Sequence, residues 1–177
     1  TPCISDPGYR VVHMAKKEGI DVITIPGPSA VTTALVMSSL PADNFTFIGF
    51  LPKKKSDRLR FISSIARNKQ TMVAFESPHR LQSSLKDLSE ILGQRRIAIC
   101  RELTKVHEEI WHGTFEEAIR YFLKPRGEFT LVIEGDTNPE TIITTIELRS
   151  ILARFKETGL TSKDAITQAV QAYGVSR

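Results

Sequence analysis

An apolar run at residues 71–75, which breaks directly into Glu76-Ser77-Pro78-His79-Arg80, constrains the fold more than any other segment. Apolar and β-branched residues over this length predict a buried strand, and the proline behind them predicts the first turn of a helix. A strand followed by a helix is typical of an α/β sheet. Ligands bind such sheets at the carboxyl ends of the strands, where this sequence places several polar side chains. The segment therefore predicts an α/β enzyme rather than a scaffold.

The same alternation continues along the chain. Strands are expected at 21–25, 45–50, 71–75, 95–100, 109–112 and 128–134, and helices at 8–18, 30–39, 56–68, 79–92, 114–123, 141–157 and 162–173. We expect three parts: residues 1–42 as the C-terminal part of a first α/β domain, 43–136 as a second α/β domain, and 137–177 as an incomplete helical appendage. The chain starts at Thr1 inside an expected loop, which indicates a piece of a longer protein.

Composition narrows the class of protein further. The 177 residues include 24 basic and 20 acidic ones, and the net charge of +4 permits a polyanionic partner without requiring one. Cys3 and Cys100 lie far apart and form no CxxC pair, which argues against a disulfide framework and a zinc site and favours the cytoplasm. A P-loop, a GxSxG elbow and a GxGxxG loop are absent from the sequence.

Two loops could expose backbone N–H groups to a ligand. The turn at 26–30 leads straight into a helix, so its N–H groups and the Ser29 hydroxyl could hold a carboxylate, a phosphate or a ribose hydroxyl. A stiff turn with Ser29 as an ordinary N-cap is the alternative. The loop at 1–8 is similar, with Asp6 as a plain helix cap as its alternative.

Two strand ends carry residues that no turn requires. Glu76 and His79 are not needed for capping, although Arg80 has the alternative of simply pairing with Glu76. After the strand at 95–100, Arg101 and Lys105 could hold phosphates and Glu102 could orient a hydroxyl, or the stretch could be a solvated charged face.

The densest positive patch follows the strand at 45–50. Lysines and arginines on a loop hold a nucleic-acid backbone without reading its sequence, and a soluble basic loop is the alternative. The candidate RNA-binding residues are Lys53, Lys54, Lys55, Arg58 and Arg60.

Six segments, at 1–8, 25–30, 49–54, 75–81, 101–105 and 127–133, together resemble the ribosomal RNA small-subunit methyltransferases of type I, in the order seen in that family. These enzymes methylate a cytidine 2′-oxygen in 16S rRNA and belong to the tetrapyrrole-methylase-like, class III methyltransferases. The resemblance implies a two-domain α/β architecture with the first domain incomplete, a small helical tail, and S-adenosylmethionine in the cleft between domains. The family's opening strand and loop are missing here, so this piece is expected to bind the donor weakly or not at all.

The resemblance also implies which residues lie beside the donor. These are Thr1, Ile4, Ser29, Ala30, Phe75, Glu76, Phe129 and Thr130. It further implies 16S rRNA in the small ribosomal subunit as substrate and a homodimer. Independently of the resemblance, the sequence has no apolar run of membrane-spanning length and no zinc-binding motif, so we expect no membrane or metal partner.

The expected reaction is an in-line displacement in which a ribose 2′-oxygen attacks the sulfonium methyl group. Glu76 or Glu102, with His79 third, is expected to remove the hydroxyl proton, and Arg80, Arg101 and Lys105 to hold the flanking phosphates. This scheme expects the strand ends to meet in one shared crevice. Two alternatives stay open at this point: a methyltransferase of precorrin-type tetrapyrroles and a non-enzymatic RNA-binding module.

Overall fold

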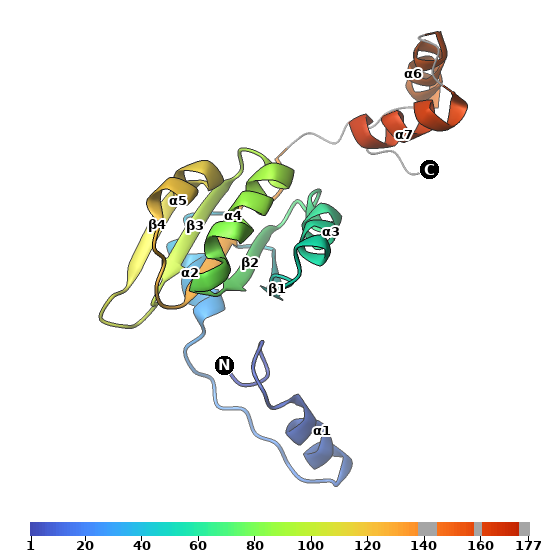
Figure 1. Ribbon diagram of the computed structural model, residues 1–177. Helices are drawn as coiled ribbons and strands as arrows, with labels where there is room; N and C mark the ends of the chain where they lie inside the picture. The colour runs from blue at the N-terminus through green and yellow to red at the C-terminus, as the bar shows by residue number, and fades with distance from the viewer. Residues whose placement is uncertain (138–144, 158–160, 174–177) are drawn as a thin grey trace. The chain divides into compact units, whose positions relative to one another are not determined.

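A computed structural model describes residues 1–137, 145–157 and 161–173. The chain divides into two compact units, Thr1–Thr137 and Asn138–Arg177 (Figure 1). The second unit contains α6 (Thr145–Glu157) and α7 (Ser162–Tyr173), while the predicted helix start at 141–144 lies outside the described residues. The finer division at residue 42 stays a prediction. None of the described helices is long and apolar enough to cross a membrane.

The first unit is built on a five-stranded sheet in the order β1-β2-β5-β3-β4. The strands are β1 (Phe45–Phe50), β2 (Thr71–Glu76), β3 (Arg96–Arg101), β4 (Glu109–Thr114) and β5 (Phe129–Ile133). β1 and β2 are parallel, whereas β5 runs antiparallel to both of its neighbours, β2 and β3. The predicted strands are therefore present, apart from the one expected at 21–25.

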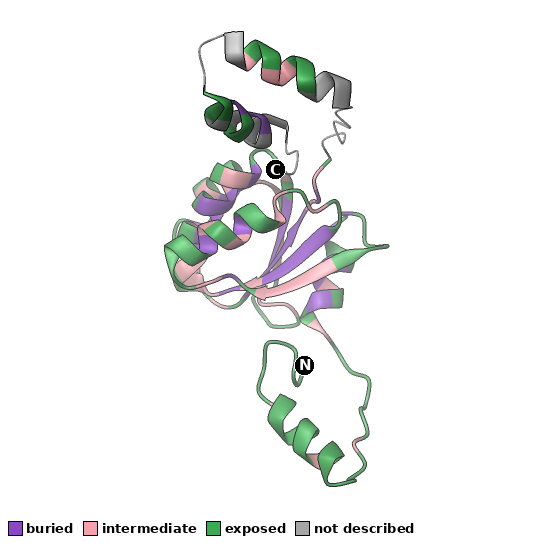
Figure 2. Ribbon diagram, turned by 90° about the vertical axis from the view of Figure 1, so that its right-hand side faces the viewer, coloured by how far each residue is buried: buried purple, intermediate pink, exposed green. Residues whose placement is uncertain are grey.

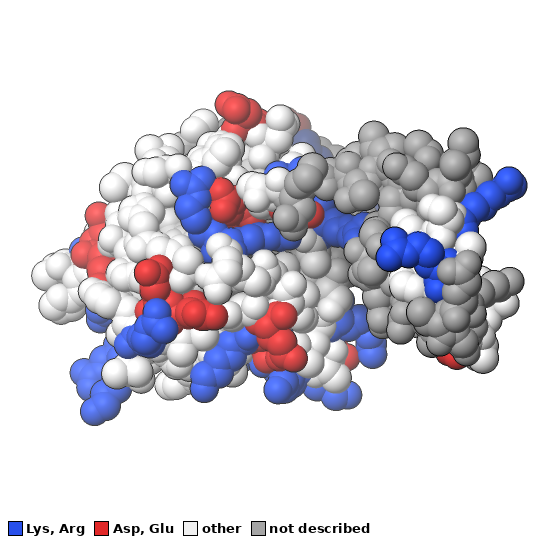
Figure 3. Space-filling model, turned by 90° about the horizontal axis from the view of Figure 1, so that it is seen from above, with Lys and Arg blue, Asp and Glu red and all other residues white. Residues whose placement is uncertain are grey.

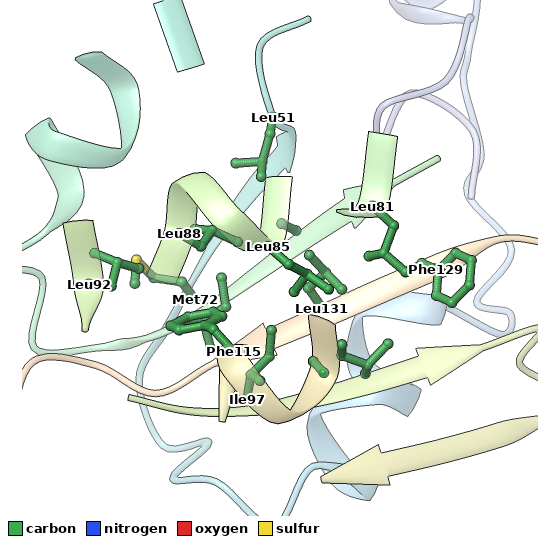
Figure 4. Packing of buried hydrophobic residues seen from close by; sticks show 14 of the residues in the cluster. Leu51, Met72, Leu81, Leu85, Leu88, Leu92, Ile97, Phe115, Phe129 and Leu131 are labelled. Carbon is green, nitrogen blue, oxygen red and sulfur yellow. The ribbon is translucent and has the colours of Figure 1, made fainter. Parts of the chain in front are cut away.

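The helices of this unit are α1 (Tyr9–Lys17), α2 (Ala30–Met37), α3 (Lys55–Ile65), α4 (Pro78–Leu92) and α5 (Phe115–Tyr121). Four of the five, α2 to α5, pack on the two faces of the sheet, whereas α1 does not. On one face, α2 buries Val31, Ala34 and Leu35 against the sheet. On the other, α3, α4 and α5 contribute to the larger hydrophobic cluster, in which Leu85 and Leu131 are fully buried (Figure 4). Burial of each such leucine contributes about 1.5–3 kcal/mol.

The central strand β5 shows why the core has two halves. All five of its residues are buried, as expected for a strand covered on both faces. Alternation directs Phe129 and Leu131 to the α4 face and Thr130 and Val132 to the α2 face. A single strand therefore contributes to both hydrophobic clusters.

Local signals set the ends of α4 and α5. Pro78 occupies the first turn of α4 behind Ser77, and Gly93 ends the helix at φ 67°, as predicted. Thr114 and Glu117 form a reciprocal capping box at the start of α5. The helix expected at 56–68 begins one residue earlier, at Lys55, and its N-cap is Lys54.

The segment expected as a strand at 21–25 is extended chain without ladder hydrogen bonds. Ile23 and Ile25 are each 86% exposed, and α1 buries none of its residues (Figure 2). No described strand lies beside this segment, so its backbone groups have no ladder partner. β-Branched residues favour a strand but do not form one without a neighbour.

Candidate functional site

The polar ends of β2 and β3 lie at one edge of the sheet, as predicted. Both strands flank β5, and Glu76 and Arg101 are each in register with Phe129. The end of β1 reaches the same edge, because Phe50 pairs with Phe75. Strands distant in the sequence thus end side by side.

The side chains at this edge do not share one crevice, which corrects the expectation from the sequence. Phe75 and Thr130 are directed to the α2 face, whereas Glu76 and Phe129 are directed to the α4 face. The reason is the alternation of a strand, which sends consecutive residues to opposite faces. The eight predicted donor-contacting residues therefore fall into separate groups.

The α2 face brings together one of these groups. Ser29 is the extended N-cap of α2 but makes no side-chain capping bond, which leaves N–H groups of the first turn uncapped by it. Phe75 is half-buried, and its ring lies 5.0 Å from that of Phe47 and 5.6 Å from that of Phe50. Thr130 is buried beneath the same face, and Ala30 is exposed at the start of α2.

The loop at 1–8 approaches the α2 end of this group. The Thr1 hydroxyl donates to the Pro28 carbonyl oxygen at 3.4 Å. A Cβ atom on Gly49 would lie 3.1 Å from the Ser5 hydroxyl, so this loop also lies against the end of β1. Ile4 is 44% exposed.

Glu76 is held by the protein on the α4 face. Its Oε1 accepts a hydrogen bond from the Ser77 amide at 2.7 Å and pairs with Arg80 at 2.7 Å. Its Oε2 accepts from the Ser84 hydroxyl at 2.6 Å. The carboxylate is buried and both oxygens are used, which favours a structural role over proton transfer. His79, one turn away, is exposed.

Glu102 forms the centre of a second polar network. Its Oε1 accepts from the Glu128 amide at 2.8 Å and from Lys105 at 3.1 Å, and Lys105 also pairs with Glu128 at 2.8 Å. Gly127 has φ 88°, and a Cβ there would lie 2.6 Å from the Glu102 side chain. Only glycine allows this close approach. The glycine at 127, directly before Glu128, was the signal in the sequence for a tight contact at this loop. The sequence did not indicate that the contact is with Glu102.

Charges shift the pKa values of this network. The hydrogen bond from the Glu128 amide and the contact with Lys105 lower the pKa of Glu102. The bonds to Glu128 and Glu102 raise the pKa of Lys105. Glu102 therefore stays ionised over a wide pH range, and among the described residues its Oε2 accepts no hydrogen bond.

Arg101 borders a hollow of about 270 Å³ on the α5 side of the edge. Its Nε donates to the Arg126 carbonyl at 2.8 Å, and its Nη1 pairs with Glu109 at 3.1 Å. Lys124 and Arg126 line the same hollow, so three basic residues surround it. The Glu109 carboxylate also accepts a hydrogen bond from the Tyr121 hydroxyl at 2.7 Å. This bond raises the pKa of Tyr121. Glu76 and Ser29 do not line this hollow.

The basic segment after β1 divides into exposed and buried residues. Lys53, Lys54, Lys55 and Arg60 are exposed, whereas Arg58 is 4% exposed and pairs with Asp87. On the face seen in Figure 3, basic and acidic side chains lie interspersed rather than in one continuous positive surface. The basic loop (residues 51–55, of which Lys55 is also the first residue of α3) is therefore a local cluster of positive charge.

Comparison of the sequence with known protein families identifies the family of this chain. The family model of the tetrapyrrole (corrin/porphyrin) methylases matches residues 1–119. The chain belongs to this family.

Within this family, the chain is similar to curated proteins named ribosomal RNA small subunit methyltransferase I. The one from Halalkalibacterium halodurans is 43% identical over 99% of this chain and 63% of its own length. The one from Mycobacterium tuberculosis is 46% identical over 98% of this chain and 60% of its own length. The chain thus spans about 60% of the length of these relatives.

Solved structures show the same fold at lower sequence identity. The methyltransferase CobJ matches with a TM-score of 0.54 and 19% identity, over 73% of this chain and 57% of that one. The cobalt precorrin-4 methyltransferase CbiF matches with a TM-score of 0.50 and 18% identity, over 70% and 56%. The predicted tetrapyrrole-methylase-like α/β fold is confirmed.

Proposed function

We propose that this chain is part of an S-adenosylmethionine-dependent enzyme that methylates a cytidine ribose 2′-oxygen in 16S rRNA of the small ribosomal subunit. The observation that carries the proposal is the similarity over nearly the whole chain to proteins named ribosomal RNA small subunit methyltransferase I. The convergence of the ends of β1, β2 and β3 at one edge supports an enzyme, because such edges bind ligands in α/β proteins.

The α2 face fits the methyl donor. Ser29 and Ala30 present uncapped N–H groups, which suit a carboxylate or ribose hydroxyls, and half-buried Phe75 offers an aromatic surface for adenine. Thr1 and Ile4 belong to the adjacent loop. When bound, S-adenosylmethionine supplies a methyl group activated by its sulfonium. Glu76 and Phe129, which face α4, act on the donor only through the strands that they stabilise.

Glu102 is the preferred base. Its ionised carboxylate keeps one oxygen without a protein partner among the described residues, whereas both oxygens of Glu76 are bound. His79, exposed at the start of α4, is the second choice. Lys105 and the Glu128 amide orient Glu102, so their contacts hold the carboxylate in place for the 2′-hydroxyl.

RNA phosphates bind at two basic places. The exposed Lys53, Lys54, Lys55 and Arg60 form the first, and Arg101 with its basic neighbours around the hollow forms the second. Arg58 and Arg80 are excluded from direct contact because their paired side chains are only 4% and 20% exposed, whereas Arg101, which also pairs with a carboxylate, is 29% exposed.

A homodimer and a cytoplasmic location belong to the same proposal. Exposed apolar side chains on α1 and α2, including Val11, Met14 and Val36, support an assembly that covers these helices. A small-ribosomal-subunit substrate supports the cytoplasm.

The test is methyl transfer from labelled S-adenosylmethionine by the full-length protein. Small ribosomal subunits are expected to be labelled at a cytidine ribose, and Glu102→Gln is expected to lower turnover at least about 100-fold through loss of the base. Transfer to precorrin-type tetrapyrroles but not to ribosomal subunits would overturn the RNA substrate. RNA binding without donor binding and without any transfer would favour a non-enzymatic RNA-binding role.

A further inference from the structure

The basic loop (residues 51–55) is held from its inner side by two arginines. Arg80 Nη1 donates to the Leu51 carbonyl oxygen at 2.8 Å. Arg58 Nη1 donates to the carbonyl oxygens of Pro52 at 3.3 Å and Lys53 at 3.2 Å. Three successive carbonyl groups of the loop therefore accept hydrogen bonds from guanidinium groups, which are strong donors.

Each of these arginines is itself fixed by a carboxylate. Arg58 donates from Nε to Asp87 Oδ2 at 2.7 Å, and its Nη2 lies 2.6 Å from the same oxygen. Arg80 pairs with Glu76 at 2.7 Å. The side chains of Arg58 and Asp87 are 4% and 5% exposed, so this pair is shielded from water and from salt. The loop is thus attached to α4 and to the end of β2.

The lysines of the loop remain exposed beside these attachments. Lys53, Lys54 and Lys55 are exposed, and the Lys55 side chain, 69% exposed, lies 4.0 Å from Asp87. A loop whose carbonyls are fixed holds its exposed side chains at a constant spacing. A ligand that binds them loses less conformational entropy than one that must order a mobile loop.

We propose that Arg58 and Arg80, with Asp87 and Glu76, position the basic loop as a preformed site for RNA phosphates. RNA as the ligand rests on the proposed function, whereas the attachment of the loop does not. Arg58 and Arg80 are positioning residues in this scheme, and the lysines make the contacts. Glu76 belongs to the same network, which joins the loop to the strand end beside the donor face.

The attachment is tested first, by limited trypsin digestion of the full-length protein. Arg58→Lys keeps the charge beside Asp87, but one ammonium group cannot also reach both carbonyls. We expect cleavage after Lys53, Lys54 and Lys55 to become about tenfold faster, as for a loop released from local structure. Asp87→Asn is a second variant with the same expected effect. The matched control is Glu134→Gln, which weakens the exposed ion pair with Arg96, away from the loop. Unchanged cleavage in both variants would overturn the attachment.

The ligand is tested second, by binding of a 16S rRNA fragment at several salt concentrations. Arg58→Lys is expected to weaken binding roughly five- to fiftyfold through the entropy of ordering the loop, with an unchanged salt slope. Lys53→Gln removes a phosphate contact, so its slope is expected to fall by about 0.7. If the Arg58→Lys slope falls as much as that of Lys53→Gln, Arg58 contacts phosphate and the positioning role is wrong. Faster trypsin cleavage without any RNA binding by the unaltered protein would refute the RNA site and the proposed function while the attachment stands.

Discussion

Replacement of Glu76 by glutamine tests whether this carboxylate supports the structure or the chemistry. The Glu76 side chain is 0% exposed, and its oxygens bind the Ser77 amide, the Ser84 hydroxyl and the Arg80 guanidinium. Removal of one partner from a buried ion pair costs about 3–5 kcal/mol. Glutamine retains one acceptor oxygen, and Arg80 is 20% exposed, so we expect a loss of about 2–4 kcal/mol in the free energy of unfolding.

The assay is thermal unfolding of the full-length protein at neutral pH, followed by circular dichroism. A loss of this size lowers the unfolding midpoint by about 5–15 °C in a protein of about 150–250 residues. Glu134→Gln is the matched control, because Arg96 is 64% exposed and such a pair contributes less than about 1 kcal/mol. Equal midpoints for the two variants, together with lost methyl transfer in Glu76→Gln alone, would refute the structural role and return Glu76 to the list of candidate bases.

Two further predictions concern the network around Glu102. Gly127→Ala is expected to lower the free energy of unfolding by about 1–3 kcal/mol, because φ at this residue is 88° and the new Cβ would meet the Glu102 side chain. Denaturant unfolding measures this loss, and a loss below about 0.5 kcal/mol would mean that the loop adjusts freely. The lowered pKa of Glu102 stabilises the folded protein above the unfolded-state pKa of about 4.3, and this contribution disappears as the pH falls through the lower folded-state pKa. The stability difference between the unaltered protein and Glu102→Gln is therefore expected to be constant near neutral pH and to shrink below about pH 4; a difference that shrinks between pH 6 and 8 would contradict the assignment.

The sheet and its helices could be predicted because their signals are local. The apolar run at 71–75, Pro78 behind it and Gly93 at the end of α4 all act over a few residues. The opposite orientation of Phe75 and Glu76 was also predictable, because consecutive strand residues face opposite sides. The expectation of one shared crevice overlooked this alternation. The extended segment at 21–25 shows the limit of local signals, since a strand needs a neighbour for its hydrogen bonds.

The candidate site depended more strongly on tertiary contacts. Nothing near Arg58 in the sequence indicates that it meets Asp87, 29 residues further along the chain, so a buried arginine was predicted as an RNA contact. Likewise, the partners of Glu102 come from the loop before β5. By itself the sequence determined the alternation of strands and helices, the polar strand ends and the positive charge after β1. Only the tertiary structure decided which of these charges are exposed and which are paired, because pairing depends on residues that the fold brings together from distant parts of the chain.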